Sequence, residues 1–362
     1  MELSRTLIVA VAAAGSFQIP SAPTLANDRL QAVKAYLSHR TAPFPFSGAV
    51  LVTVGDRVLL DEAYGEADLE LHVSNRPTTL FRIGSLTKPF TATATMALVE
   101  HDKLALTDAV CKYVQSCPTE WSSVQISHLL SHTSGIPDLF GDVAAVPIER
   151  TRAAIDAAVQ AAHNTRLDSA AGTTYAYSNF NYMLLGYIIE VASGQLWFDV
   201  VRERILKPAG LANTVYDDVW AIVPDRARGY EFVNGWRNVT YKDYAGFSAG
   251  GLLSTTHDVA RFGRMFAKGL LVKPSTVADM ATPRRGDYGY GWQIKHYFGR
   301  RAFNHSGGTY GFASHVAVYP EDDVVVAVLS NLENEPAKTT ACNIAAMLFG
   351  SPPSSLSGCP AS

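Results

Sequence analysis

The stretch RRAFNHSGGTYGFASHVAVYPEDDVVVAVLSN, residues 300–331, contains three consecutive runs rich in β-branched and aromatic residues. Such runs predict β-strands, and the turn residues Pro320, Glu321 and Asp322 separate the second run from the third. Residues from about 335 to 349 then show helical spacing. The C-terminal part of the chain is therefore predicted to form an antiparallel sheet that is closed by a helix.

Strands are also predicted near the beginning of the chain. Residues 28–40 repeat apolar positions at helical spacing, and residues 48–65, GAVLVTVGDRVLLDEAYG, form two β-rich runs around Gly55 and Asp56. A Gly-Asp pair between two such runs is typical of a two-residue hairpin turn. Between about 85 and 285 the apolar spacing is mostly helical and is interrupted by loops rich in Gly, Pro and Ser.

Strands at both ends with helices between them predict an α/β fold of the α+β type, with an antiparallel sheet assembled from the two chain ends. We expect the sheet-bearing parts at about 27–84 and 286–349, an inserted helical region at about 85–285, and a tail at 350–362. An α/β-hydrolase would instead alternate strand and helix along the chain. The sequence does not show that alternation.

Composition narrows the range of partners. The 362 residues are 48% hydrophobic, and 30 Lys plus Arg against 33 Asp plus Glu give a net charge of −3 without long runs of one sign. Such a distribution shows no electrostatic footprint for nucleic acid or an anionic membrane. We expect a small-molecule or peptide substrate, no nucleic acid and no stable membrane partner, and the sequence leaves the oligomeric state open.

Residues 1–26 have the features of a signal peptide: Arg5, an apolar run over residues 7–14, and small residues before Asn27. The run is too short to span a bilayer, which needs about 20 residues. Glu2 reduces the positive charge that a signal peptide has at its N-terminus. The alternative is therefore that this segment is an uncleaved membrane anchor. We predict a periplasmic or secreted protein whose mature chain starts near Asn27.

The four cysteines form two near pairs in the sequence. An even number in an exported protein predicts disulfides, and three pairings are possible. Proximity favours Cys111–Cys117 and Cys342–Cys359. Four buried free thiols are the alternative, and no cysteine spacing in the chain favours a zinc site.

Two serines compete for the role of nucleophile, and the first lies in GFSAG, residues 246–250. This segment matches the nucleophile elbow G-x-S-x-G of the α/β-hydrolases, and a triad of Ser248, Asp287 and His305 would have a suitable order. An elbow needs a buried strand before the serine and a helix directly after it. Polar and aromatic residues precede Ser248, two glycines follow it, and the next helix is predicted only after an N-cap at Thr255. We therefore interpret GFSAG as a glycine-rich turn and keep the elbow as the weaker alternative.

The second candidate, Ser85, lies in FRIGSLTKPF, residues 81–90, three positions before Lys88. Residues three apart on a helix lie on neighbouring parts of one face. A lysine amine that is neutral because water is excluded from it could accept the serine proton. The purely structural alternative is an N-capping serine followed by a solvated lysine. This segment is the only Ser-x-x-Lys in the sequence.

Two further segments complete an ordered set of motifs. YAYSNFNY, residues 175–182, contains Tyr-x-Asn, and FNHSGGTYGF, residues 303–312, contains His-x-Gly. Ser-x-x-Lys, Tyr-x-Asn and His-x-Gly in this order resemble the serine β-lactamase and penicillin-binding-protein superfamily, in the branch of class C β-lactamases, DD-carboxypeptidases, esterases and D-aminopeptidases. The resemblance extends from about 30 to 350 through HLLSHTSGIPDL, SAGGLLSTTHDVARF and YGYGW. It implies a β-lactamase/transpeptidase-like serine hydrolase domain over 27–349.

The resemblance also implies roles for individual residues. An acyl-enzyme would form on Ser85, with Lys88 as its proton partner, and Tyr177 would pass the proton to the leaving group. The backbone N–H groups of Ser85 and Gly308 would form the oxyanion hole. The substrate-binding residues would be Asn179, His305, Gly307 and Gly308. The resemblance implies no cofactor.

His305 is the departure that bears on the substrate. Classical β-lactamases have lysine at this position, a permanent cation for a substrate carboxylate, whereas histidine is mostly uncharged near neutral pH. We expect small esters or amides of modest charge to be preferred over β-lactams and carboxylate-terminated peptides. If His305 is the only carboxylate contact, carboxylate substrates should gain relative to neutral esters as it protonates. Arg300 or Arg301 could instead reach in and restore the missing charge. The runner-up is a penicillin-binding sensor that is acylated without turnover, and the complete Ser, Lys, Tyr and Asn set argues against it.

His128 and His132 are spaced four apart, as in a helical zinc pair. However, Leu129 stands where the H-E-x-x-H motif requires glutamate. We therefore predict a structural role for this segment and no metal.

Overall fold

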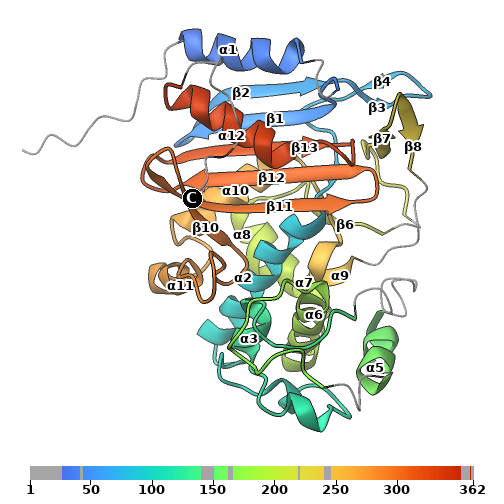
Figure 1. Ribbon diagram of the computed structural model, residues 1–362, viewed down its shortest axis with the longest axis vertical. Coiled ribbons are helices and arrows are strands. Elements are labelled where there is room, and N and C mark those ends of the chain that lie inside the picture. Colours follow the sequence, from blue (N-terminus) through green and yellow to red (C-terminus); the bar gives the residue numbers. More distant parts are fainter. Residues whose placement is uncertain are drawn as a thin grey trace, which may run out of the picture.

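One antiparallel sheet, built from both ends of the chain, lies in the upper half of the molecule (Figure 1). Its strand order is β10-β11-β12-β13-β1-β2. The strands are β1 Gly48–Val54, β2 Arg57–Tyr64, β10 Gln293–Tyr297, β11 Arg300–Thr309, β12 Phe312–Tyr319 and β13 Val324–Ser330. Strand β1 pairs with β13, with Gly48 opposite Ser330. The predicted α/β fold and its hairpin at Gly55 and Asp56 are confirmed, while β10 is an addition that the sequence reasoning missed.

The computed structural model describes residues 27–40, 44–139, 151–161, 166–218, 221–239, 246–351 and 359. The predicted signal peptide and most of the predicted tail lie outside these residues.

Strand β13 lies in the middle of the sheet and is buried along its whole length. Within it, Val325, Ala327 and Leu329 face one apolar core and the alternate valines at 324, 326 and 328 face another. A strand that is covered on both faces needs a continuous apolar run instead of an alternating one. The sequence VVVAVLS meets that requirement.

Helices cover both faces of the sheet (Figure 1). Helices α1, Asn27–Ser38, and α12, Ala337–Leu348, pack together on one face, where α12 contacts β12 and β13. Helix α10, Thr256–Ala267, packs against the other face. The predicted N-cap of α10 is confirmed, because the Thr255 side chain accepts a hydrogen bond from the backbone N–H of Asp258.

The helical region lies below the sheet in Figure 1. Its centre is α2, Thr87–Glu100, in which every residue from Thr87 to Leu98 is buried. Around it lie the 3₁₀ turns η1 Gly84–Leu86, η2 Val110–Lys112 and η3 Thr119–Trp121, and the helices α3 Ile126–Leu130, α5 Thr151–Ala161, α6 Asn179–Ser193, α7 Trp197–Val201, α8 Lys207–Ala209, α9 Phe247–Gly250 and α11 Pro274–Met280. A π-helical turn, η6 Arg202–Leu206, joins α7 to α8.

Short strands that were not predicted complete the structure. They are β3 Glu66–Asp68, β4 Val73–Ser74, β5 Phe81–Arg82, β6 Val215–Tyr216, β7 Tyr230–Phe232, β8 Trp236–Asn238 and β9 Leu252–Ser254. Strands β5, β9 and β6 form a three-stranded sheet within and beside the region expected to be helical. Two or three residues are too few to leave a periodic pattern in the sequence.

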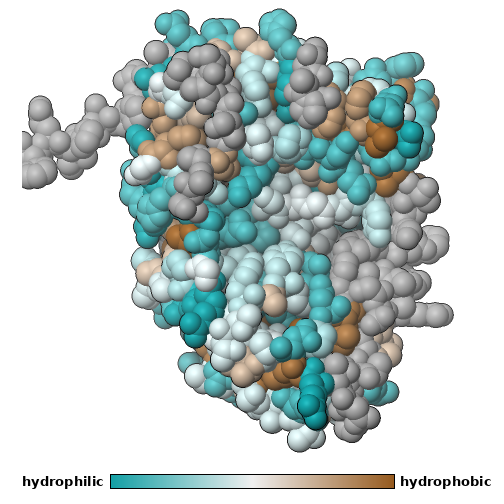
Figure 2. Space-filling model, in the orientation of Figure 1, coloured by the Kyte–Doolittle hydropathy of each residue, from teal (hydrophilic) through white to brown (hydrophobic). Residues whose placement is uncertain are grey.

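The surface in Figure 2 is largely polar, with an apolar patch at the upper right, over β4 and β8. The exposed side chains of Val73 and Trp236 belong to those two strands. In the part of the chain that the structure describes, no single helix is long and apolar enough to cross a membrane. Helix α6 and residues 197–209 pass that test together, by length and composition only, with an 80° bend between them.

Both predicted disulfides are present. Cys111 is bonded to Cys117, and Cys342 is bonded to Cys359. The first links η2 to the turn that precedes η3, and the second ties Cys359 to α12. Each bridge closes a short loop, and neither connects the sheet with the helical region.

Two glycines allow η1 to approach β11 closely. Gly84 has φ +50°, and a Cβ atom there would lie 2.8 Å from the carbonyl oxygen of Gly308. A Cβ atom at Gly307 would lie 2.0 Å from the carbonyl oxygen of Ile83, which already accepts a hydrogen bond of 2.8 Å from Ser314 Oγ. Ile83 and Gly84 immediately precede Ser85, so this contact sets the position of that serine relative to the sheet.

The alanine variants of Gly307 and Gly308 should differ in stability. We expect Gly307→Ala to lower the free energy of unfolding by about 1–3 kcal/mol, the usual cost of overpacking, because its Cβ meets backbone. A Cβ at Gly308 would have no atom within 4 Å, so Gly308→Ala should fold like the wild type. Urea unfolding of the two variants checks this, and equal stabilities would contradict the contact.

Candidate active site

Ser85 and Lys88 lie at the start of the buried helix α2. Ser85 is in the turn η1 and is half-buried, and Lys88 is in the first turn of α2 and fully buried. Lys88 Nζ lies 2.9 Å from Ser85 Oγ. The helix-face argument from the sequence therefore holds, and the alternative of a solvated lysine is wrong.

The other two polar contacts of Lys88 are both acceptors. Its Nζ lies 2.7 Å from Asn179 Oδ1 and 2.9 Å from the carbonyl oxygen of Ala249. A neutral amine has two N–H donors for these two oxygens and one lone pair, which can accept the Ser85 hydroxyl proton. Burial lowers the pKa of Lys88 to about 7, and the charge of Asp138 opposes that shift. The neutral amine is thus accessible near neutral pH.

Tyr177 and Asn179 reach the site from the start of α6. Ser178 between them is the N-cap of this helix, and its side chain accepts a hydrogen bond from the backbone N–H of Asn181. Lys88 Nζ lies 4.9 Å from the centroid of the Tyr177 ring. Burial of the phenol raises the pKa of Tyr177, although 40% of the surface of the whole residue is exposed. A hydrogen bond with Ser85 lowers the same pKa. Tyr177 therefore stays protonated at neutral pH.

Gly308 lies near the end of β11, in a suitable position for an oxyanion-hole donor. In the register of β11 and β12, Thr309 faces Phe312 across a two-residue turn and Gly308 faces Ala313. Opposed residues of an antiparallel pair alternate in their hydrogen bonding, so Gly308 next to the turn-closing pair directs its N–H away from β12. On the side of β11 that faces away from β12, strand β10 pairs with β11 only as far as Asn304. The predicted donor thus lies on a part of β11 that β10 does not cover.

His305 is buried and has both ring nitrogens engaged. Its Nδ1 lies 2.7 Å from the carbonyl oxygen of Ser306, which can only accept, so Nδ1 carries the proton. Its Nε2 lies 2.9 Å from the hydroxyl of Tyr288 and accepts from it. Burial lowers the pKa of His305 to about 3, and the charge of Lys88 lowers it further. With both nitrogens engaged and this lowered pKa, His305 stays neutral between pH 5 and 8, so we expect no gain of carboxylate substrates from its protonation in that range.

Arg300 and Arg301 do not restore the missing charge. Arg300 pairs with Asp322 and lies over the ring of Phe349, and Arg301 pairs with Glu321. Both begin β11, whereas His305 and Gly308 lie toward its other end. This alternative is also wrong.

Ser248 is a structural residue. It is fully buried in α9, and its Oγ donates a hydrogen bond of 2.7 Å to the carbonyl oxygen of Tyr182. Asp287 is ion-paired with Lys295 and is half-exposed. Because neither partner of the proposed triad meets Ser248, the elbow alternative is wrong. The same turn supplies the Ala249 carbonyl that holds Lys88.

The two histidines of this pair have separate hydrogen-bond partners. His128 Nδ1 accepts from the backbone N–H of Gln125, whereas His132 lies beyond the end of α3 and its Nδ1 accepts from the backbone N–H of Ser178. No group of three or more metal-ligating side chains occurs among the described residues.

Tyr288 and Asp138, near the site, had no predicted role, and His132 had only a predicted structural one. Tyr288 bonds His305, the His132 ring packs 4.3 Å from the ring of Tyr177, and Asp138 bonds the start of α6. They come from HLLSHTSGIPDL and YGYGW, which the resemblance had singled out as segments only. Their contacts join distant parts of the chain, so no local spacing indicates them.

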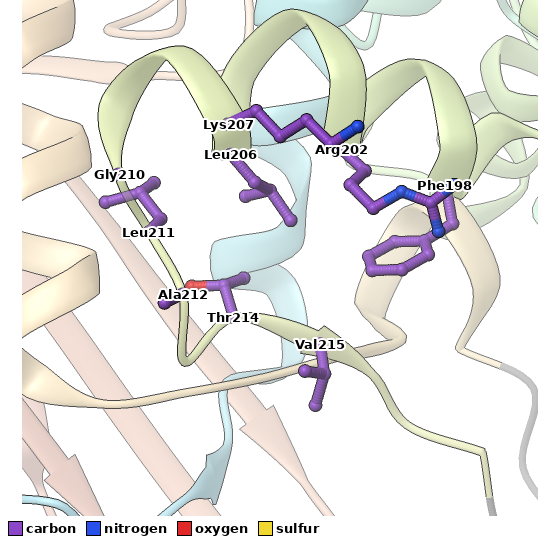
Figure 3. Close-up of a pocket in the computed structure, with 9 residues that line it drawn as sticks. All are labelled: Phe198, Arg202, Leu206, Lys207, Gly210, Leu211, Ala212, Thr214 and Val215. Carbon is purple, nitrogen blue, oxygen red and sulfur yellow. The ribbon is translucent and has the colours of Figure 1, made fainter.

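A pocket of about 450 Å³ lies away from these residues (Figure 3). It is formed by the segment from α7 to β6, and none of the predicted site residues lines it. Arg202 and Lys207 on its rim are paired with Glu203. Most of its remaining lining is apolar.

A sheet assembled from both chain ends, with a Ser–Lys pair at the start of a buried helix and a glycine-rich strand beside it, is the arrangement expected for the serine β-lactamase and penicillin-binding-protein superfamily. The profile of the family described as Beta-lactamase matches residues 43–350. The chain belongs to the β-lactamase family.

Two curated relatives are similar over most of this chain. Penicillin-binding protein 4* of Bacillus subtilis is 30% identical over 336 residues, which is 85% of this chain and 73% of that protein. Protein flp of Staphylococcus aureus is 26% identical over 86% of this chain, and the chain spans 65% of its length.

Solved structures share the fold. The octameric penicillin-binding protein homologue from Pyrococcus abyssi has a TM-score of 0.77 at 26% identity, over 90% of this chain and 79% of that one. The D-amino acid amidase from Ochrobactrum anthropi SV3 has a TM-score of 0.71 at 21% identity, over 84% and 92% of the two chains.

The protonation of Lys88 should determine how kcat/KM falls at acid pH. Because a protonated amine cannot accept the Ser85 proton, kcat/KM for a neutral ester should fall about tenfold per pH unit below a pKa of about 7. Lys88→Arg should be inactive at every pH, since arginine does not deprotonate in proteins. Initial rates from pH 5 to 9 check this, and a flat profile in the wild type would rule out Lys88 as the base.

Proposed function

We propose that this protein is a serine hydrolase that cleaves an ester or amide through an acyl-enzyme on Ser85. The observation that carries the proposal is the contact of Ser85 Oγ with the buried amine of Lys88, whose pKa burial lowers to about 7. Neutral Lys88 accepts the hydroxyl proton while Oγ attacks the carbonyl carbon. The negative charge that develops on the carbonyl oxygen is met by the N–H groups of Ser85 and Gly308.

Tyr177 completes the proton path in this proposal. Its ring lies over Lys88, and its hydroxyl is protonated and bonded to Ser85. When the tetrahedral intermediate breaks down, Tyr177 gives its proton to the leaving group and takes the one held by Lys88. Water then attacks the acyl-enzyme, its proton returns along the same path, and Ser85 leaves as the free hydroxyl.

The state of His305 supports a preference for uncharged carbonyl substrates over β-lactams and other carboxylates. Its one N–H donor is used by Ser306, so it offers neither a cation nor a donor to a carboxylate. A charge-assisted hydrogen bond contributes about 1.5–3 kcal/mol, and its loss corresponds to one to two decades in affinity. The penicillin-binding sensor remains the second candidate because the family includes penicillin-binding proteins.

We also propose export, supported by the signal-like start and by the two disulfides. Recovery of the protein from the oxidising compartment, with its N-terminus near Asn27, is the corresponding test.

Covalent labelling should identify the nucleophile. A fluorophosphonate adduct should map to the peptide that contains Ser85, and Ser85→Ala should lose activity while Ser248→Ala keeps it. The second variant loses only one buried hydrogen bond, worth about 1 kcal/mol of stability. Peptide mass spectrometry checks the adduct, and labelling on Ser248 would overturn the proposal.

A substrate panel should separate the hydrolase from the sensor. We expect kcat/KM for p-nitrophenyl acetate to exceed that for nitrocefin by at least tenfold, with continued turnover of the ester. A stoichiometric burst without turnover on every substrate would favour the sensor. A higher kcat/KM for nitrocefin would show that His305 does not decide the preference.

A further inference from the structure

Tyr177 lies in a segment without regular secondary structure. Residues 174–178 belong to no helix or strand, and α6 begins only at Asn179. In the proposed reaction the phenol of Tyr177 must reach both Ser85 and the leaving group, and a misplacement of about 1 Å can lower a rate about 100-fold. Contacts from elsewhere in the chain must therefore hold this segment in place.

The segment HTSG, residues 132–135, provides such contacts along the loop that precedes α6. The carbonyl oxygen of Thr133 accepts a hydrogen bond of 2.7 Å from the backbone N–H of Gly172. The carbonyl oxygen of Gly135 accepts another of 2.7 Å from the backbone N–H of Asp168. The backbone of the loop is thus bonded to this segment at several points.

His132 binds the backbone on both sides of Tyr177. Its carbonyl oxygen accepts a hydrogen bond of 2.9 Å from the backbone N–H of Ala176. Its ring atom Nδ1 accepts one of 3.1 Å from the backbone N–H of Ser178. Between these two bonds the ring packs against the ring of Tyr177, with 4.3 Å between the ring centroids. One residue therefore contacts three consecutive residues, with Tyr177 in the middle.

The imidazole of His132 is suited to this contact because it is fully buried and neutral. Burial, and then the charge of Lys88, hold the pKa of His132 well below its ordinary value, so Nδ1 keeps the lone pair that the N–H of Ser178 requires. Nε2 is also buried and has no hydrogen-bond partner among the described residues. The bond to Ser178 is thus the one polar contact that the ring makes within the described part of the chain.

The backbone of His132 is also held in an unusual conformation. Its φ is +55°, in the left-handed region, which a non-glycine residue keeps only where the surrounding structure holds it there. In this conformation the carbonyl group bonds Ala176 while the side chain bonds Ser178. Both parts of the residue are therefore used on the same short stretch of chain.

We propose that His132 is a positioning residue for Tyr177, which it holds through the peptide groups on either side so that the phenol can protonate the leaving group. His132 acts through Tyr177 and transfers no proton itself. This inference rests on the proposed acyl-enzyme reaction and extends it by one residue. The loss of His132 should therefore be most severe for substrates whose leaving group needs a proton.

The test compares two esters that share an acyl group and differ in the leaving group. p-Nitrophenolate leaves without a proton, whereas an alkoxide must be protonated as it leaves. The measured quantity is kcat/KM for ethyl butyrate divided by kcat/KM for p-nitrophenyl butyrate. A variant that only reduces the fraction of folded enzyme lowers both values equally, so that effect cancels in the ratio.

Three variants should give different ratios. Tyr177→Phe removes the acid and should lower the ratio about 100-fold or more. His132→Phe keeps a ring but lacks Nδ1, and should lower the ratio about tenfold. His132→Asn should keep the ratio within about threefold, because Oδ1 replaces Nδ1 as acceptor and asparagine tolerates a left-handed φ.

His128 provides the matched control. Its Nδ1 accepts a backbone N–H bond of the same kind, 3.2 Å from the nitrogen of Gln125, so His128→Phe should leave the ratio unchanged. Equal losses on both esters in His132→Phe, or a ratio that falls as far in His132→Asn, would overturn the role of Nδ1.

Other outcomes would count against the proposed function instead. A ratio unchanged in Tyr177→Phe, or a wild type inactive on the ethyl ester, would overturn the proposed proton path. Activity retained in Ser85→Ala would overturn the acyl-enzyme itself.

Discussion

The contact between the turn η1 and strand β11 is the constraint on which the site depends. The proposed nucleophile, Ser85, belongs to the turn η1 and the predicted oxyanion donor to a sheet, so their relative position is only as accurate as the packing of these two elements. Glycine at 84 and at 307 lets backbone meet backbone there, without side chains whose rotamers could vary. The buried length of α2 then fixes Lys88 against the same junction. Catalytic geometry is in this sense a result of core packing.

Burial also decides which charges the site can hold. An isolated ammonium inside a protein is costly, and the protein lowers that cost by letting Lys88 lose its proton near neutral pH. His305 follows the same logic, with Tyr288 and the Ser306 carbonyl satisfying both nitrogens of a neutral ring. A carboxyl group, that of exposed Asp138, lies outside this dry centre. The site therefore combines a neutral interior with a charged rim.

The sequence predicted the parts of the structure that depend on local patterns. Long strands, the hairpin at Gly55, the N-cap at Thr255 and the Ser85–Lys88 contact all follow from spacings of a few residues. Ser248 shows where prediction from local patterns fails. The sequence GFSAG matches the nucleophile-elbow motif, but its serine side chain is directed into the core. Tyr288 and Asp138 matter only after the chain has brought residues 17 and 42 positions apart into contact. A two-residue strand such as β5 leaves no periodicity to detect.

The pairing of β1 with β13 has a consequence for how the chain folds. The middle of the sheet joins residues near position 50 to residues near position 328, so the central ladder cannot form until β13 has been synthesised. Contacts of such long sequence separation slow folding, since the entropy of closing the loop is lost before the pairing is gained. A nascent chain of this protein therefore stays without the middle of its main sheet until β13 has emerged.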